Sequence, residues 1–203
     1  MKTKQEMTQD RDDAISFLRQ VLAEVYFVFD TETTGKDKNY DQIVQWGILT
    51  YTGKQSKSLS KATIPVSEGA YGIHHISDID LENAPNIYNS GVMDKILYGK
   101  YVVCYNIEFD ARVLKNSLRA SGSGLEIDID NDKIFKPCDV MRLCAAFRGE
   151  WSEKYNDYRW RKLDFVCEEF GIEIDLPLHD AMSDAIMTEQ VMKYIASQKL
   201  STE

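Results

Sequence analysis

Three acidic segments, far apart in the chain, contain the side chains best suited to catalysis. They are Asp30 and Glu32 within FDTETTG, Asp110 within NIEFD, and His179 with Asp184 within HDAMSD. Four carboxylates and one imidazole can hold two divalent cations and activate a water molecule against a phosphodiester. Mg²⁺ prefers oxygen ligands, so carboxylates suit it better than thiols would. The pattern therefore predicts a metal-dependent hydrolytic site.

The first segment follows a predicted central strand. Residues 25–29 are apolar without polar alternation, which is typical of a strand that is buried on both faces and covered by helices. Asp30 and Glu32 stand two residues apart, so on an extended strand end their side chains point to the same side. Two carboxylates on one side repel each other unless a cation lies between them, which favours a metal site.

A second buried strand, residues 101–105, leads into the segment that contains Asp110. Asn106 is expected to cap the following helix, and Asp110 falls in the first turn of that helix, where a carboxylate is favoured. Ligand sites in open α/β sheets lie at the carboxyl ends of parallel strands. We therefore expect Asp110 to lie near Asp30 and Glu32.

The third segment lies just before and inside the last predicted helix, which could pack across the same sheet edge. Each segment alone has an ordinary explanation: Asp30 and Glu32 as a solvated turn, Asp110 as a helix-start charge, His179 and Asp184 as surface residues. All three together, in this order, are better explained by one site.

The remaining hydrophobic pattern predicts an α/β layer fold with a mixed sheet. Three consecutive strands with short links suggest an antiparallel meander, and strand–helix alternation follows it. The expected strands are 25–29, 43–51, 57–64, 101–105 and 134–137, and the expected helices are 10–24, 86–98, 106–119, 139–147, 161–170 and 180–196. A loop-rich stretch is expected around residues 73–77, and another loop at 149–160.

Length and charge limit the possible functions. A chain of 203 residues favours one domain, placed at 25–198, with a helical extension at 1–24. The net charge of −9 argues against a protein that wraps long duplex DNA, so contact with nucleic acid is expected to be short. The four cysteines form no CxxC pair, which predicts free buried thiols. The charged N-terminus lacks a secretory pattern and no apolar run is long enough to span a membrane, so we expect a cytoplasmic protein.

With these motifs in place, the chain resembles the DnaQ-like, or DEDDh, 3′–5′ exonucleases, with the epsilon proofreading subunit of bacterial DNA polymerase III as the most similar type. FDTETTG, NIEFD and HDAMSD look like the three exonuclease motifs, and residues 71–76 resemble the loop between the first two. The resemblance spans about residues 25–196. It implies a ribonuclease H-like fold with a five-stranded mixed sheet.

The resemblance also implies roles for the acidic residues. Asp30 would bridge two Mg²⁺ or Mn²⁺ ions, Glu32 and Asp184 would bind the first, and Asp110 would hold the second, largely through water. His179 would be the general base for the attacking water. Residues that match positions around the terminal nucleotide are Thr33, Gly35, His74, Asn106 and Phe109.

Two residues depart from the family pattern. Tyr105 stands where relatives often have His, and His75 replaces a usual Gly. Both fall at positions expected to contact substrate, so they bear on nucleotide preference rather than on the metal site.

The function that follows is metal-dependent hydrolysis of single-stranded DNA from its 3′ end, with release of nucleoside 5′-monophosphates. Trimming of RNA 3′ ends on the same scaffold is an alternative. A subunit whose main role is to bind a DNA polymerase is another, although an intact catalytic set argues against an inactive scaffold.

One further stretch interleaves aromatic and basic side chains. Residues 151–162 contain four aromatic and four basic residues: Trp151, Tyr155, Tyr158 and Trp160, with Lys154, Arg159, Arg161 and Lys162. Such a mixture suits stacking on single-stranded bases. The alternative, which we favour from the sequence, is that Trp160 and some of the tyrosines pack under a long loop.

Overall fold

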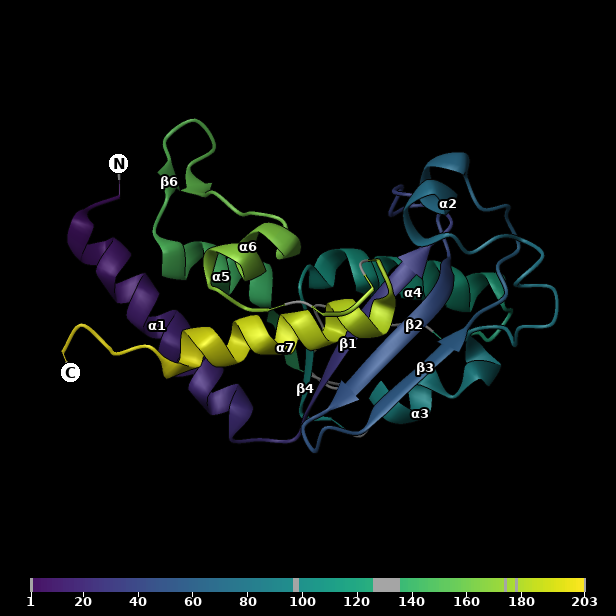
Figure 1. Cartoon of the computed structure of the whole chain (residues 1–203), viewed down its shortest axis with the longest axis horizontal. Coiled ribbons are helices and arrows are strands. Elements are labelled where there is room, and N and C mark those ends of the chain that lie inside the picture. Colours follow the sequence, from purple (N-terminus) through teal and green to yellow (C-terminus); the bar gives the residue numbers. More distant parts are fainter. Residues whose placement is uncertain (1, 97–98, 126–135, 174, 178, 203) are drawn as a thin grey trace.

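The computed structural model describes residues 2–96, 99–125, 136–173, 175–177 and 179–202. Its main sheet consists of β1 (Tyr26–Thr33), β2 (Ile43–Thr50), β3 (Gln55–Leu59), β4 (Tyr101–Cys104) and β5 (Lys136–Asp139), in the order β3-β2-β1-β4-β5. β2 is antiparallel to β1 and β3, whereas β4 runs parallel to both β1 and β5. The predicted five-stranded mixed sheet is confirmed (Figure 1).

Helices cover both faces of this sheet. One face packs against α1 (Lys4–Leu22), α5 (Val140–Arg148), α6 (Leu163–Glu169) and α7 (Ala181–Ser197), and the other against α3 (Val92–Ile96) and α4 (Ile107–Ala120). Tyr26 and Val28 of β1 belong to the first core, and Phe27 and Phe29 to the second. Because both faces of β1 are covered, both sets of its side chains are apolar, which explains why its sequence lacks polar alternation. Side chains alternate between the two faces of a strand, so Asp30 and Glu32 point to the same face as Tyr26 and Val28, the face covered by α7.

Several predicted elements differ from the observed ones. The loop-rich stretch contains a short helix, α2 (Glu68–His74), which begins at Ser67, whose side chain accepts a hydrogen bond from Ala70 N. The predicted helix 86–98 is a 3₁₀ turn, η1 (Tyr88–Ser90), followed by α3, because Gly91 between them has a φ of 78°. Residues 97–98 of that prediction lie outside the described residues.

The predicted loop 149–160 contains a small hairpin, formed by β6 (Trp151–Ser152) and β7 (Asp157–Tyr158). The N-terminal helix is longer than predicted, because Thr3 and Glu6 form a capping box at its start. β3 is shorter than predicted and ends at Leu59. The strand predicted at 134–137 is observed as β5, and residues 134–135 lie outside the described part.

The four cysteines are free and buried, as predicted. Within the described residues, no helix combines the length and the apolar character needed to cross a bilayer.

Candidate active site

Three of the predicted carboxylates lie together at the carboxyl end of β1. One oxygen atom from each of Asp30, Glu32 and Asp184 lies within 4.8 Å of the others. Asp30 and Glu32 reach this point from one face of β1, and Asp184 reaches it from the first turn of α7. Three carboxylates at these separations can share a divalent cation.

The close approach of α7 depends on residues that the sequence analysis did not single out. Gly47 of β2 is the register partner of Asp30 in β1. A Cβ atom at Gly47 would lie 2.6 Å from the backbone of Ala181, so only glycine lets α7 lie this close to the sheet. The Gln45 side chain accepts a hydrogen bond from Ala181 N at 2.9 Å. A lone glycine inside a strand pattern is the signal that could have indicated this contact.

Asp110 lies beside the three clustered carboxylates and is buried in the first turn of α4. Its Oδ1 accepts a hydrogen bond from Thr31 Oγ1 at 2.8 Å. Because Thr31 lies between Asp30 and Glu32, this bond ties the start of α4 directly to the acidic end of β1. The structure thus brings the four predicted carboxylates to one edge of the sheet.

The carboxylates raise one another's pKa values. Burial, followed by the charges of Asp110, Asp184 and Glu32, holds the pKa of Asp30 well above its usual range. Burial and the Asp184 charge raise the pKa of Glu32 to about 8. Burial raises the pKa of Asp110 to about 7, and burial with the Asp180 charge raises the pKa of Asp184 to about 7. The free protein therefore binds protons at this site near neutral pH.

The donor set fits divalent cations. Among the described residues, no lysine, arginine or histidine forms an ion pair with Asp30, Glu32, Asp110 or Asp184. Several buried carboxylates without a compensating cation are costly, and a cation would offset that cost. The donors are all oxygen atoms, which suits Mg²⁺ or Mn²⁺ rather than soft metals.

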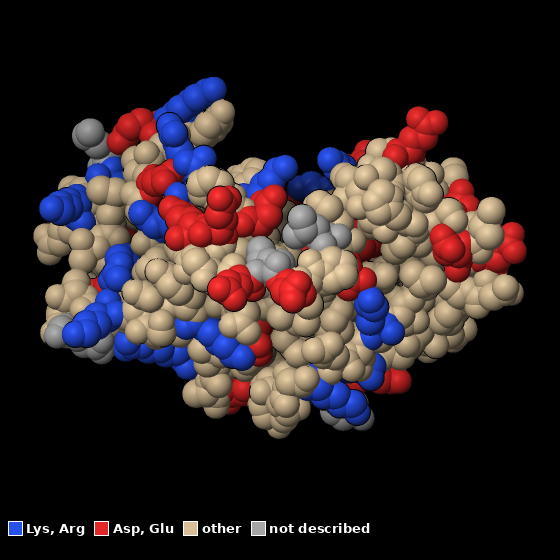
Figure 2. Space-filling view, viewed as in Figure 1, with Lys and Arg blue, Asp and Glu red and all other residues tan. Residues whose placement is uncertain are grey.

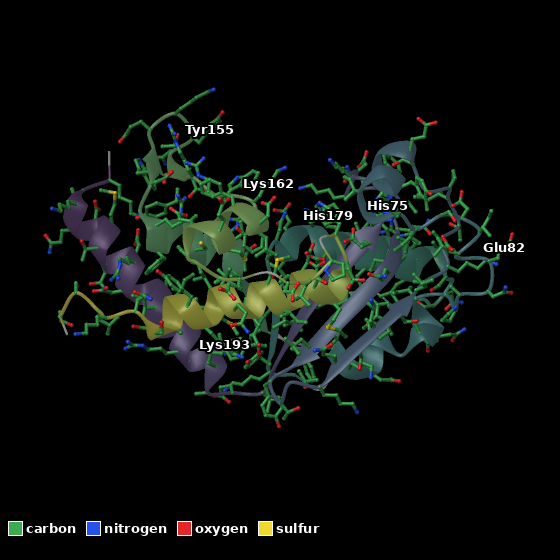
Figure 3. The ribbon with its side chains drawn as sticks, in the orientation of Figure 1. His75, Glu82, Tyr155, Lys162, His179 and Lys193 are labelled. Carbon is green, nitrogen blue, oxygen red and sulfur yellow. The ribbon has the colours of Figure 1, made fainter. Side chains whose placement is uncertain are left out.

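His179 lies at the mouth of the same site and is exposed. Its φ of 56° places it in the left-handed region, which is uncommon for a residue other than glycine. The next residue, Asp180, begins α7: its side chain accepts hydrogen bonds from Met182 N and Ser183 N. Figure 3 shows His179 at the start of α7, between Lys162 and His75. Strained backbone of this kind is common where a side chain is held for a function.

A cavity of about 360 Å³ opens over these residues, between α2 and the start of α6. Figure 2 shows the corresponding hollow in the upper edge of the molecule, with basic side chains on both sides of it. Of the residues predicted to surround a terminal nucleotide, the cavity is lined by Thr33, Gly35, His74 and Phe109. Asn106 lies elsewhere: it occupies the N-cap position of α4 without a capping bond, and its side chain lines a neighbouring cavity.

Some of these residues also shape the cavity wall. Thr33 Oγ1 donates to Gly35 O at 2.5 Å, and the Asp41 carboxylate occupies the space that a Cβ atom at Gly35 would need. His74 Nδ1 accepts from Ile76 N, which leaves Nε2 to donate to Thr33 O at 3.0 Å. Both ring nitrogens of His74 are therefore engaged within the protein, and only its ring surface is available to a ligand.

The two departures from the family pattern have structural explanations. Tyr105 is buried, and its hydroxyl donates to Arg161 O at 2.6 Å, so it anchors a neighbouring segment and does not line the cavity. His75 is the residue after α2 and adopts a φ of 58°, the conformation for which glycine is usual at a helix end. Its ring packs edge-on against Tyr71 and does not line the cavity. The expectation that both positions contact substrate is therefore not supported by this geometry.

Comparison with known proteins identifies the family. Residues 27–192 match the exonuclease family model RNase_T, and this range contains all five predicted catalytic residues. The chain belongs to this exonuclease family. The resemblance found in the sequence is confirmed, and this chain is an exonuclease.

Relatives include exonucleases from several sources. The exonuclease CP81 of Escherichia phage 186 is 26% identical over 174 residues, which are 82% of this chain and 86% of the phage protein. The 3′–5′ exonuclease DinG of Staphylococcus haemolyticus is 26% identical over 82% of this chain, and a PolC-type DNA polymerase III of Caldanaerobacter subterraneus is 25% identical over 82%. The matched part is only 17% of that DinG protein and 11% of that polymerase.

Solved structures show the same fold. Escherichia coli exonuclease I in complex with a dA16 oligonucleotide superposes with a TM-score of 0.68 at 18% identity, over 87% of this chain and 41% of that chain. Exonuclease X in complex with 5′-overhanging duplex DNA superposes with a TM-score of 0.58 at 18% identity, over 86% and 95% of the two chains.

Proposed function

We propose that this exonuclease removes nucleotides from the 3′ end of single-stranded DNA and releases nucleoside 5′-monophosphates. The observation that carries the proposal is the cluster of Asp30, Glu32 and Asp184. Glu32 and Asp184 line an open cavity, and the exposed His179 lines it as well. We also propose that residues 25–198 form the catalytic domain and that the segment 1–24, which contains α1, is an extension packed on it.

Asp30, Glu32, Asp110 and Asp184 would hold two Mg²⁺ or Mn²⁺ ions. When bound, such ions stabilise the charge that develops on the attacking and leaving oxygens of a phosphodiester. Other residues of the chain would hold these carboxylates in position. The hydrogen bond from Thr31 fixes the Asp110 carboxylate, and the packing of α7 on Gly47 fixes Asp184 against β1.

His179 would accept a proton from the attacking water. Its imidazole lies in the cavity wall and makes no hydrogen bond or ion pair in the described part of the structure, so the unprotonated ring nitrogen of either tautomer is free to accept that proton. A neutral imidazole is suited to general-base catalysis near neutral pH.

The terminal nucleotide would be held by the opposite part of the cavity. Phe109 of α4 is half-buried and lines it, so its ring can stack on a base. Thr33 and His74 would shape the space around the sugar. Asn106 faces the neighbouring cavity, so it would contact the strand beyond the terminal nucleotide.

Strand polarity and substrate class test this proposal. DNA and RNA oligonucleotides labelled at the 5′ end, and circular single-stranded DNA, would be incubated with the protein and Mg²⁺. We expect a ladder that shortens from the 3′ side of linear single-stranded DNA, slow attack on blunt duplex, and no attack on circles. Internal cuts at the outset, or equal rates on circles, would instead show an endonuclease. Faster hydrolysis of RNA would favour an exoribonuclease.

A further inference from the structure

The segment after the β6–β7 hairpin forms a wall between the active-site cavity and a second cavity. The second cavity, of about 320 Å³, is lined at one side by Asn106 and Glu108 of the α4 start and at the other by Tyr158 and Trp160. The active-site cavity is lined by Phe109 and Lys162, which follow Glu108 by one residue and Trp160 by two residues along the same two segments. The two cavities are therefore neighbours, and a strand that ends in the first can continue into the second.

Trp160 presents an aromatic surface to solvent at this point. It is 61% exposed and lines the second cavity, so the expectation that it packs under a loop is wrong. The other aromatics of the hairpin differ. Trp151 and Tyr158 pack edge to face at 5.1 Å between ring centroids, whereas Tyr155 lies exposed at the hairpin tip (Figure 3). A tryptophan exposed to this extent beside a cavity is a surface on which an apolar or aromatic ligand group can stack.

The wall is held in place by bonds to the rest of the protein. The Tyr105 hydroxyl at the end of β4 donates to Arg161 O at 2.6 Å. Arg161 Nη2 lies 2.8 Å from a Glu150 carboxylate oxygen, and Arg159 N donates to Glu150 O at 2.8 Å. The backbone on both sides of Trp160 is thus fixed, which reduces the entropy lost when a ligand stacks on the ring.

The charges around the wall favour an anionic ligand. Lys36, Arg159 and Lys162 are exposed and have no carboxylate partner in the part of the chain that the structure describes. Lys36 and Lys162 line the active-site cavity, and Arg159 directly precedes Trp160. Unpaired cations gathered here are notable in a chain whose net charge is −9.

Carboxylates also occur beside the second cavity. Glu108 is compensated, since Lys38 Nζ lies 2.5 Å, Arg112 Nε 3.5 Å and Arg142 Nη2 3.7 Å from its oxygens. Asp157 lines the cavity and accepts a hydrogen bond from Tyr158 N, without a basic partner among the described residues. Asp164 lines the active-site cavity and likewise has no basic partner among the described residues. Outside the carboxylate cluster, the three exposed cations named above therefore lie beside two uncompensated carboxylates, one on each side of the wall.

We propose that this wall is a second nucleotide subsite, which binds the unpaired DNA strand immediately upstream of the terminal nucleotide. A base would stack on Trp160, and Arg159 and Lys162 would contact the adjoining phosphates. This inference rests on the proposed function and adds to it a preference for a single-stranded segment several nucleotides long. Stacking on aromatic side chains with nearby cations is how proteins bind single strands without reading their sequence.

Tryptophan fluorescence tests the subsite without hydrolysis. The chain has three tryptophans, of which Trp46 is buried, Trp151 is half-buried and Trp160 is exposed. In EDTA, a 12-nucleotide oligo(dT) should quench the emission of the wild-type protein in a saturable way, and Trp160→Phe should abolish that quenching. Saturable quenching that persists in Trp160→Phe, or no quenching in the wild type at oligonucleotide concentrations that saturate hydrolysis, would overturn the proposal.

Dependence on substrate length provides the kinetic test. The kcat/KM of Trp160→Ala would be compared with that of the wild type on a dinucleotide and on the 12-mer in Mg²⁺. We expect the loss on the 12-mer to exceed the loss on the dinucleotide by about tenfold, since base–aromatic stacking has that strength. The control is Tyr51→Ala, which removes an aromatic ring that is 50% exposed at the β2–β3 turn. Any change in its kcat/KM should be equal on the dinucleotide and on the 12-mer. Equal losses for Trp160→Ala would refute the subsite while leaving the exonuclease proposal intact.

Discussion

Replacing Glu32 with glutamine should stabilise the metal-free protein while removing its activity. Burial and the Asp184 charge raise the pKa of Glu32 from 4.5 to about 8, so folding takes up a proton between these pH values. The folded state is then favoured at low pH, and this contribution to stability is lost progressively as pH rises toward 8. Each unit of pKa difference corresponds to about 1.4 kcal/mol, so the buried Glu32 carboxylate lowers the free energy of unfolding at pH 8 by at most about 5 kcal/mol.

The increase in the free energy of unfolding for Glu32→Gln should be about half that bound, because the glutamine amide must also be desolvated. For a chain of this size the gain corresponds to a Tm about 5–10 °C higher than that of the wild type in EDTA at pH 8. Thermal melts at pH 6 and pH 8, with and without Mg²⁺, measure it. Mg²⁺ should raise the wild-type Tm more at pH 8, where its carboxylate ligands are deprotonated, and should raise the variant Tm much less.

The exposed Glu153 on the hairpin provides a matched control, since it has no ion pair among the described residues. Glu153→Gln should leave both the Tm in EDTA and the response to Mg²⁺ unchanged. The reasoning is refuted if Glu32→Gln melts below the wild type in EDTA at pH 8. It is also refuted if Mg²⁺ stabilises that variant as strongly as it stabilises the wild type.

Substitutions at three further positions test separate parts of the site. Two variants of His179 test the general base: alanine, and asparagine, which tolerates the left-handed backbone of this position. Both variants should hydrolyse DNA about 10²–10⁴-fold more slowly than the wild type and should still bind metal in a calorimetric titration. Loss of metal binding would show that His179 is a metal ligand instead. Gly47→Ala should displace α7, lower the unfolding free energy by about 1–3 kcal/mol and lower the rate of hydrolysis. Gly69→Ala is the control, because the space around its Cβ position is open, and it should change neither stability nor rate. Equal behaviour of the two variants would contradict the packing of α7 on Gly47. Phe109→Ala should raise KM for single-stranded DNA by about 5- to 100-fold with little effect on metal binding, and an unchanged KM would exclude stacking on this ring.

The sequence predicted the parts of the fold in which local pattern and tertiary environment agree. The apolar runs that became β1 and β4 have no polar alternation, so their central position in the sheet and the convergence of Asp30 and Asp110 could be inferred. The helix α2 was missed because Gly69 and Gly72 weaken its helical pattern over only seven residues.

Contacts between distant residues could not be inferred in the same way. The approach of Ala181 to Gly47 joins segments more than 130 residues apart, and a single glycine in a strand does not indicate what approaches it. The exposure of Trp160 was also missed, because a mixture of aromatic and basic residues does not reveal which side chains pack inward. In the structure, Trp151 and Tyr158 pack on each other and leave Trp160 outside.

The mechanism depends on hydrolysis of the terminal phosphodiester of a DNA strand by the carboxylate cluster. Its most direct test is the release of nucleotide from a single-stranded oligonucleotide labelled on its 3′-terminal residue, by wild type and Asp30→Asn, in Mg²⁺ or EDTA. We expect the first labelled product of the wild type to be a nucleoside 5′-monophosphate, formed only with Mg²⁺, and a rate at least about 10³-fold lower for folded Asp30→Asn. A longer first product, activity in EDTA, or near-wild-type release by Asp30→Asn would contradict this mechanism.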